Sequence, residues 1–335
     1  MNRSGMTPEE VKQALARDRQ IADLDLGGID LSGQDLSGSR FTNVSLAGAN
    51  LSGAKLANAD FQQADLRGAN MTRTQAAGAT FTRADLRTAL AQDADFSGAH
   101  FNACDCSGAS FAGARFVRAD AYGSVFAETN FTRAVLLRWT AMDTDLASAK
   151  LGGASLRNAY LKGANLRGHD LRTCDLSMTI LDAAQLQGAN LGGLALDRTS
   201  FIDAQLDGAV LAGVNGQYTA LLGARLAQAD LQGARFDMSD ASGADFSSAR
   251  ADGVQWERSV LKKTCWQRAS LKTARFVYCD LSHADVSGAD GSRADLSGSN
   301  AHALKQDGTR WDGANLNHMR PTDDLLLQAE QWRAR

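Results

Sequence analysis

The 335-residue chain has little of several residue types that mark particular protein classes. It contains only 2 prolines, and aromatic residues make up 7% of it, whereas glycine occurs 32 times. This composition excludes collagen, proline-rich linkers and disordered acidic chains. No apolar run approaches the roughly 18 residues of a membrane-spanning helix, and the N-terminus lacks the apolar core of a signal peptide. We therefore expect a cytoplasmic protein without a membrane span.

The chain also lacks a large excess of either charge. Its 38 acidic and 35 basic residues give a formal net charge of −3, so no strong overall field draws it to nucleic acid or to an anionic membrane. The 5 cysteines include no Cys-x-x-Cys pair. This spacing predicts neither a disulfide framework nor a zinc site, and it suits a reducing compartment.

A repeat of five residues fills most of the chain. A position that we call the centre recurs every five residues from Ile21 to Leu316 without an insertion, and a large apolar residue occupies 49 of its 60 occurrences. A small residue precedes most centres by two positions, and a short polar residue, often Asp or Asn, lies between the two. Glycine is frequent two positions after the centre, a place that we call the corner.

A period of five fits neither an α-helix nor a β-strand, but it fits a chain that turns a corner every five residues. Four such sides close one coil, and successive coils stack like parallel strands roughly 4.8 Å apart. The centre and the small residue before it then point inward. Centres that lie four repeats apart should stack on one another, which predicts one phenylalanine per coil at Phe41, Phe61, Phe81 and Phe101.

Units such as ANLSG at residues 49–53 and ADLRG at residues 64–68 resemble the pentapeptide-repeat family. The resemblance implies a right-handed quadrilateral parallel β-helix. We therefore expect an all-β solenoid of about 15 coils with short helical caps at both ends. The expected parts are an N-terminal capping helix at residues 1–20, the β-helix at residues 21–318, and a C-terminal capping or dimerisation helix at residues 319–335.

The N-terminal helix carries its own start signals. Thr7 is placed to cap it, Pro8 suits the first helical position, and Glu10 completes a capping box. Val11 and Leu15 give the helix an apolar face to lay on the first coil.

The C-terminal helix allows two interpretations. Capped by Thr322 or Asp323, it forms either a lid on the last coil or a contact within a homodimer, because adjacent leucines cannot all face one side of a helix. Its candidate contact residues are Leu325, Leu326, Leu327 and Trp332.

Three columns of outward residues are candidates for function. An acidic column either imitates a phosphate backbone or bonds locally at the corners, with Arg67 and Arg87 offsetting its charge; it comprises Asp25, Asp65, Asp85, Asp105 and Asp145. Exposed apolar groups and Tyr, Met and Arg side chains are typical of protein interfaces. A second column, of apolar residues, comprises Tyr122, Met142, Tyr160, Ile180, Ile202 and Leu222. A third column lies at the corners and comprises Met178, Arg198, Tyr218, Met238, Arg258 and Tyr278.

Residue patterns for catalysis are missing from the repeat. His283 and His302 share one side of adjacent coils, but no acidic or cysteine column in the repeat completes a metal site beside them. We expect no catalytic residue, no metal and no cofactor, and therefore not an enzyme.

The sequence favours a non-enzymatic rigid scaffold or adaptor whose partner is another protein rather than nucleic acid. Residues 7–33 are similar to free-standing pentapeptide proteins of bacterial type VI secretion loci, which implies an accessory role there. Family resemblance also offers an alternative, a DNA mimic that binds DNA gyrase and gives quinolone resistance. The small net charge and the arginines in the acidic column depart from that pattern.

Overall fold

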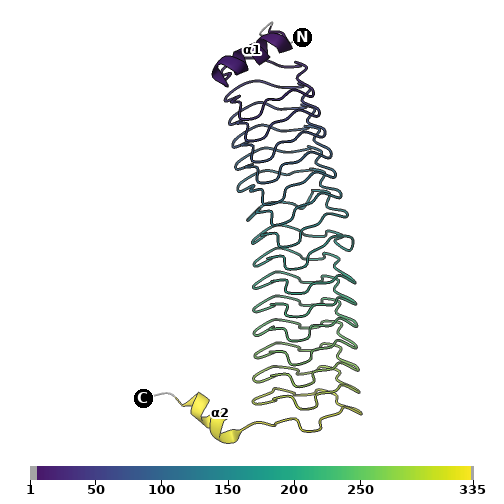
Figure 1. The fold of residues 1–335 in the computed structure, drawn as a ribbon. Helices are drawn as coiled ribbons and strands as arrows, with labels where there is room; N and C mark the ends of the chain where they lie inside the picture. Colours follow the sequence, from purple (N-terminus) through teal and green to yellow (C-terminus); the bar gives the residue numbers. More distant parts are fainter. Residues whose placement is uncertain (1–5, 333–335) are drawn as a thin grey trace. The chain divides into compact units, whose positions relative to one another are not determined.

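The structure is a computed structural model that describes residues 6–332. It contains two helices, α1 at Pro8–Asp18 and α2 at Asp324–Gln331, with stacked coils between them (Figure 1). The chain divides into two compact units. Unit 1 comprises Met1–Asn165 and Thr173–Leu176, and unit 2 comprises Leu166–Arg172 and Ser177–Arg335. Neither helix of the described residues is long and apolar enough to cross a membrane.

Helix α1 begins where the sequence predicts it. The Thr7 side chain accepts a hydrogen bond from the Glu10 amide, and the Glu10 carboxylate accepts one from the Thr7 amide, which is the predicted capping box. Val11 and Leu15 are buried, so the predicted apolar face of α1 is confirmed.

Hydrogen bonds between coils set a register of four repeats. In unit 1, Asp65 pairs in parallel with Asp85, and in unit 2, Asp245 pairs with Cys265. The amide of centre Leu66 donates to the Asp85 carbonyl at 2.7 Å, and the Asp85 amide donates to the Ala64 carbonyl at 3.0 Å. The predicted coil of four sides is therefore present. Each side contributes a single bridging residue, so the described residues form isolated bridges rather than the expected strands.

A tight turn at each corner allows the next side to begin. The Ala69 amide donates to the carbonyl of centre Leu66 at 3.0 Å, which closes a four-residue turn. Gly68, the third residue of this turn, has a φ of 62°, as a type II turn requires. Corners without glycine keep this conformation, as Arg73 does with a φ of 56°.

The centres and the small residues before them form the core, as predicted. Phe41, Phe61, Phe81 and Phe101 are fully buried, and successive ring centroids lie 5.1, 5.2 and 4.8 Å apart. This ladder confirms that equivalent residues of successive coils stack on one another. Unit 2 repeats the arrangement with tryptophan, because Trp256 stacks on Phe236 at 4.8 Å and Trp266 stacks on Phe246 at 4.0 Å.

The C-terminal helix does not form the expected lid. Asp323 caps α2 by accepting hydrogen bonds from the amides of Leu325 and Leu326, yet none of the helix residues, all within the described part, is buried. The helix lies beside the last coils of unit 2 instead of across their open end (Figure 1). Inward-facing Leu316 of the last coil is consequently 40% exposed.

We predict that two buried tryptophans of unit 2 respond differently to the same substitution. Trp266 donates its indole N–H to Thr264 at 3.1 Å, whereas Nε1 of Trp256 is buried and finds no partner within residues 6–332. Trp256→Phe removes an unsatisfied donor, and Trp266→Phe removes a satisfied one. Urea unfolding should show Trp266→Phe to be more destabilising by about 1 kcal/mol. Equal losses of stability would contradict the assignment of these donors.

Candidate functional site

The acidic column predicted from the sequence lies in unit 1, and its carboxylates bond locally. Oδ1 of Asp25, Asp105 and Asp145 each accepts the amide two residues further on, at 2.9, 3.0 and 3.0 Å. These are Asx turns that hold the chain at the corner. The structure therefore supports the local interpretation of the column.

Arginines neutralise the middle of this acidic column. Arg67 reaches Asp65 at 2.6 Å and Asp85 at 3.6 Å, and Arg87 reaches Asp85 at 2.6 Å and Asp105 at 3.7 Å. The hydrogen bond from the Arg67 side chain lowers the pKa of Asp65. These carboxylates are held by their own chain and do not form an unpaired anionic row.

We predict that the carboxylates of these Asx turns, which stand just before the centres, make the stability of the fold sensitive to acid. In unit 2, the side-chain hydrogen bond from Ser292 and the nearby Arg310 lower the pKa of Asp290 from 3.8 to about 2. The stability from this group is complete above its unfolded pKa and is lost as the pH falls through its folded pKa. Melting temperatures between about pH 5 and about pH 2 should therefore fall less steeply in Asp290→Asn than in the wild type.

The control for this acid prediction is Asn130→Ala. It removes the comparable hydrogen bond from the Thr132 amide to the Asn130 side chain at 3.0 Å, but no titrating group. It should shift the melting temperature equally at every pH. An unchanged acid slope in Asp290→Asn would refute the contribution of this carboxyl.

The second column, of apolar residues, is less exposed than the sequence suggested. Tyr122 is 58% exposed, but Met142 and Tyr160 in unit 1 are half-buried. Its members in unit 2, Ile180, Ile202 and Leu222, are half-buried as well. The sequence predicts a protein contact at this column because its apolar side chains are expected to be exposed, and of its six members only Tyr122 is exposed.

The third column stands out clearly from unit 2, and we call it the corner ladder. Tyr218 and Tyr278 are 51% and 65% exposed, Met238, Arg198 and Arg258 are also exposed, and only Met178 is half-buried. All six residues have positive φ angles between 53° and 59°. Six successive coils thus carry a large side chain in a conformation that favours glycine. The six are Met178, Arg198, Tyr218, Met238, Arg258 and Tyr278.

Large residues at positive φ also occupy other corners, such as Arg118, Arg138 and Lys263, so what distinguishes the corner ladder is the run of six such residues in successive coils. At the neighbouring corner of the same coils, four successive residues with positive φ are glycines, Gly193, Gly213, Gly233 and Gly253. The side chains of the corner ladder also cover one another and the next coil. The Arg198 guanidinium lies 5.8 Å from the centroid of the Tyr218 ring, and a Cβ added to Gly298 would lie 2.5 Å from the Tyr278 ring.

An ion pair between a buried carboxylate and a half-exposed arginine supports the middle of the corner ladder. Asp237, whose side chain is 7% exposed, pairs with Arg235 at 2.5 Å and accepts the Glu257 amide at 3.1 Å. The hydrogen bond that Arg235 donates to Asp237 raises the pKa of Arg235. The ladder residue next to Asp237, Met238, is thereby fixed to two coils at once.

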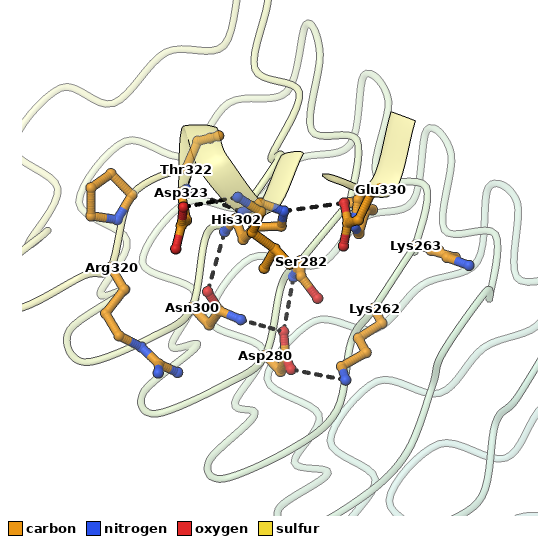
Figure 2. A pocket seen from close by; sticks show the side chains of 13 residues that line it. Lys262, Lys263, Asp280, Ser282, Asn300, His302, Arg320, Thr322, Asp323 and Glu330 are labelled. Atoms are coloured by element: carbon orange, nitrogen blue, oxygen red, sulfur yellow. Dashed lines mark hydrogen bonds and ion pairs between the residues drawn. The ribbon is translucent and has the colours of Figure 1, made fainter. Parts of the chain in front are cut away.

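A pocket of about 660 Å³ opens where α2 meets the last coils of unit 2 (Figure 2). Its floor is a polar network around Asp280, which accepts from the Ser282 amide at 3.1 Å and from the Asn300 side chain at 3.0 Å. Lys262 pairs with the other carboxylate oxygen of Asp280 at 3.3 Å. Lys263, Arg320 and Asp323 add further charges to the wall.

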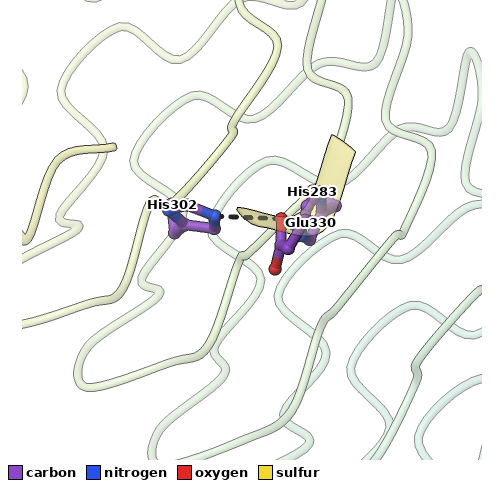
Figure 3. Close-up of side chains that lie close together, drawn as sticks. All are labelled: His283, His302 and Glu330. Atoms are coloured by element: carbon purple, nitrogen blue, oxygen red, sulfur yellow. Dashed lines mark hydrogen bonds and ion pairs between the residues drawn. The ribbon is translucent and has the colours of Figure 1, made fainter. Parts of the chain in front are cut away.

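Two histidines and a glutamate converge at this pocket (Figure 3). Oε2 of Glu330 lies 3.1 Å from Nε2 of His283 and 3.3 Å from Nε2 of His302. The hydrogen bond from His302 lowers the pKa of Glu330 against the opposing effect of burial, and His283 adds to the lowering. The Asp323 amide donates to Nδ1 of His302 at 3.1 Å, so Nε2 of this ring carries the proton that faces Glu330.

The sequence pairs the two histidines but misses their acidic neighbour. Glu330 belongs to α2, outside the repeat whose register places residues side by side. The only sequence signal is the glutamate itself, on a short helix whose position the repeat does not determine.

Comparison with known proteins identifies the repeat. The model of pentapeptide repeats matches eight segments, at residues 25–63, 54–90, 92–126, 142–177, 179–215, 217–247, 257–290 and 269–304. No curated protein sequence matches the chain.

Several solved structures are similar over part of the chain. A trypsin-treated variant of QnrB1, a plasmid-mediated fluoroquinolone resistance protein, is 24% identical with a TM-score of 0.32, and the match covers 59% of this chain and 86% of that one. HetL, a pentapeptide repeat protein involved in heterocyst differentiation regulation from the cyanobacterium Nostoc, is 23% identical with a TM-score of 0.23, covering 76% and 97%. A pentapeptide repeat protein from the Arabidopsis thaliana thylakoid lumen is 30% identical with a TM-score of 0.19, covering 34% and 66%.

At these TM-scores the likenesses to solved structures carry no argument about function. The repeat model, by contrast, matches well over half of the chain. The protein therefore belongs to the pentapeptide-repeat family, whose members fold as right-handed quadrilateral β-helices.

Proposed function

We propose that this protein is a non-enzymatic rigid scaffold that binds another protein through the corner ladder of unit 2. The observation that carries the proposal is that all six corners of the ladder hold a large side chain at positive φ. That conformation costs a residue other than glycine on the order of 1–2 kcal/mol. Pentapeptide-repeat proteins are generally structural or interaction proteins, which supports the same class of function.

The composition of the ladder indicates the chemistry of its partner. Tyr, Met and Arg are enriched at protein interfaces, because they combine a large apolar area with a polar group. Arg198 and Arg258 suit carboxylates, and Tyr218, Met238 and Tyr278 suit aromatic and aliphatic side chains. Asp197 and Glu257 lie beside the two arginines in sequence, so the strip has no strong charge of one sign. We therefore favour a protein surface as its partner.

We predict that the double substitution Tyr218→Gly with Tyr278→Gly abolishes partner binding without unfolding the protein. Glycine tolerates the φ of 57° and 56° at these corners, so stability should be unchanged or higher by up to about 1 kcal/mol. Quantitative affinity capture from the native host should recover one partner with the wild type and lose it with the variant.

The matched control for the ladder is Gln228→Gly with Arg268→Gly, at corners of a different column with φ of 60° and 58°. This control should retain the partner. Equal recovery by the ladder variant and by the control would place binding elsewhere.

The alternative functions receive less support. A DNA mimic that binds DNA gyrase would need a row of unpaired carboxylates, whereas Arg67 and Arg87 pair with three members of the acidic column. We therefore expect gyrase supercoiling to be indifferent to this protein. The relation to type VI secretion rests on residues 7–33 alone, and the comparisons add nothing to it.

We also propose that the C-terminal end of the chain forms a homodimer. Leu325, Leu326 and Trp332 are 79%, 47% and 75% exposed, close in sequence to the uncovered Leu316 of the last coil. Exposed apolar groups beside an uncovered end of a solenoid favour a cover, which a second copy of the chain would supply.

We predict that light scattering will give twice the 35.5 kDa chain mass for the wild type and the single chain mass for Leu325→Glu with Leu326→Glu. Leu90→Glu is the control, because Leu90 is 46% exposed but lies in unit 1, and it should leave the mass unchanged. A wild-type chain that is monomeric at high concentration would exclude the dimer.

A further inference from the structure

We propose that His283, His302 and Glu330 bind a divalent transition-metal ion, with zinc as the best match, and that this ion ties α2 to the last coils of unit 2. Two imidazoles and a carboxylate are borderline nitrogen and oxygen ligands of the kind that zinc takes in proteins. The three groups come from two successive coils and from the helix. The site is separate from the corner ladder and does not depend on the function proposed for it.

The geometry already resembles a coordination shell. The three ligand atoms all lie within 4.8 Å of one another. The two edges that meet at Oε2 of Glu330 measure 3.1 and 3.3 Å. Zinc bonds of about 2.0–2.2 Å in a tetrahedron place neighbouring ligand atoms roughly 3.4 Å apart. The two edges at Glu330 therefore already fit an ion, and the two imidazoles, whose ligand atoms lie within 4.8 Å of each other, would move closer together to complete the shell.

The surroundings fit a zinc site with three protein ligands. The His302 side chain is only 6% exposed, so the coil fixes its position, whereas His283 and Glu330 are about one-third exposed, at 34% and 37%. The adjoining pocket leaves room for a water molecule as the fourth ligand (Figure 2). Lys262 is paired with Asp280, so its charge is partly compensated before an ion arrives.

A proton competes with the metal ion at His302. The Asp323 amide donates to Nδ1 of this ring at 3.1 Å, so the metal-free ring keeps its proton on Nε2. Metal binding at Nε2 moves the ring proton to Nδ1 and breaks the hydrogen bond from Asp323. Losing one hydrogen bond of this kind weakens binding by about tenfold. Loss of a neighbour that orients a ligand costs a metal site a similar 10–100-fold, and such sites still bind metal.

The weak anchoring of α2 gives the ion a structural role. The helix has 8 residues, and none of them, all lying in the described range, is buried. A helix this short is marginal by itself, and most helices gain their stability from a packed apolar face. The side chain of Glu330 is the contact through which α2 reaches both histidines (Figure 3). Replacing that hydrogen-bonded contact by three metal bonds would order the helix against unit 2.

Zinc titration of the full-length protein, after treatment with a chelator, tests the site. Calorimetry should show one zinc ion per chain, and cobalt should give the strong visible absorption of tetrahedral coordination. Glu330→Gln keeps the shape of the side chain on an exposed helix and should weaken zinc binding by at least about 100-fold. His283→Gln should have the same effect. These two variants avoid disturbing the buried His302.

The controls are His318→Gln and His100→Gln, which alter histidines outside the cluster and should bind zinc like the wild type. Zinc should also slow chymotrypsin cleavage after Leu325 and Leu326 in the wild type and in both controls, but not in Glu330→Gln. The proposal is overturned if the wild type shows no saturable binding at one equivalent, or if Glu330→Gln binds zinc as tightly as the wild type. Loss of binding in either control would overturn it as well.

Discussion

Each coil of this protein is held by backbone hydrogen bonds to the coils before and after it, and every other feature depends on that ladder. The amide of a centre donates to a carbonyl of the following coil, and the amide of a bridging residue donates to a carbonyl of the preceding coil. Because both partners are backbone groups, the ladder does not depend on side-chain identity. It does require the chain to turn after every fifth residue, which is why positive φ recurs at the corners.

The turn requirement explains how the surface is used. An aspartate before a centre closes the corner by accepting the amide two residues on, so much of the acidic surface is engaged by the chain itself. The side chain of a corner residue is not needed for the turn. It projects outward from a backbone conformation that glycine would adopt more easily. The corner is thus the place where a large side chain is least explained by folding. For this reason the ladder from Met178 to Tyr278 supports a binding role better than the acidic column does.

Features that follow from the repeat could be predicted from the sequence. The inward positions, the stacking of Phe41 on Phe61 and the capping box at Thr7 all depend on local spacing, and all three are present. The exposure of the second column could not be predicted, because coils stacked on either side cover much of its side chains. The position of α2 could not be predicted from the sequence either, for a different reason. No repeat continues past the last coil, so nothing in the spacing indicates that Glu330 returns to His283 and His302.

The constant length of the coil also determines what insertions and deletions would do within one unit. Removing a whole coil would leave each later side chain on its original face. Removing a single repeat would keep the backbone pairing intact while rotating everything downstream by a quarter turn relative to what precedes it. A column of aligned side chains would then be split between two adjacent faces, and the centres on the two sides of the deletion would stack on new neighbours. In such an architecture, deleting one repeat can move part of a binding surface to another face of the coil, whereas a point substitution can only remove one of its side chains.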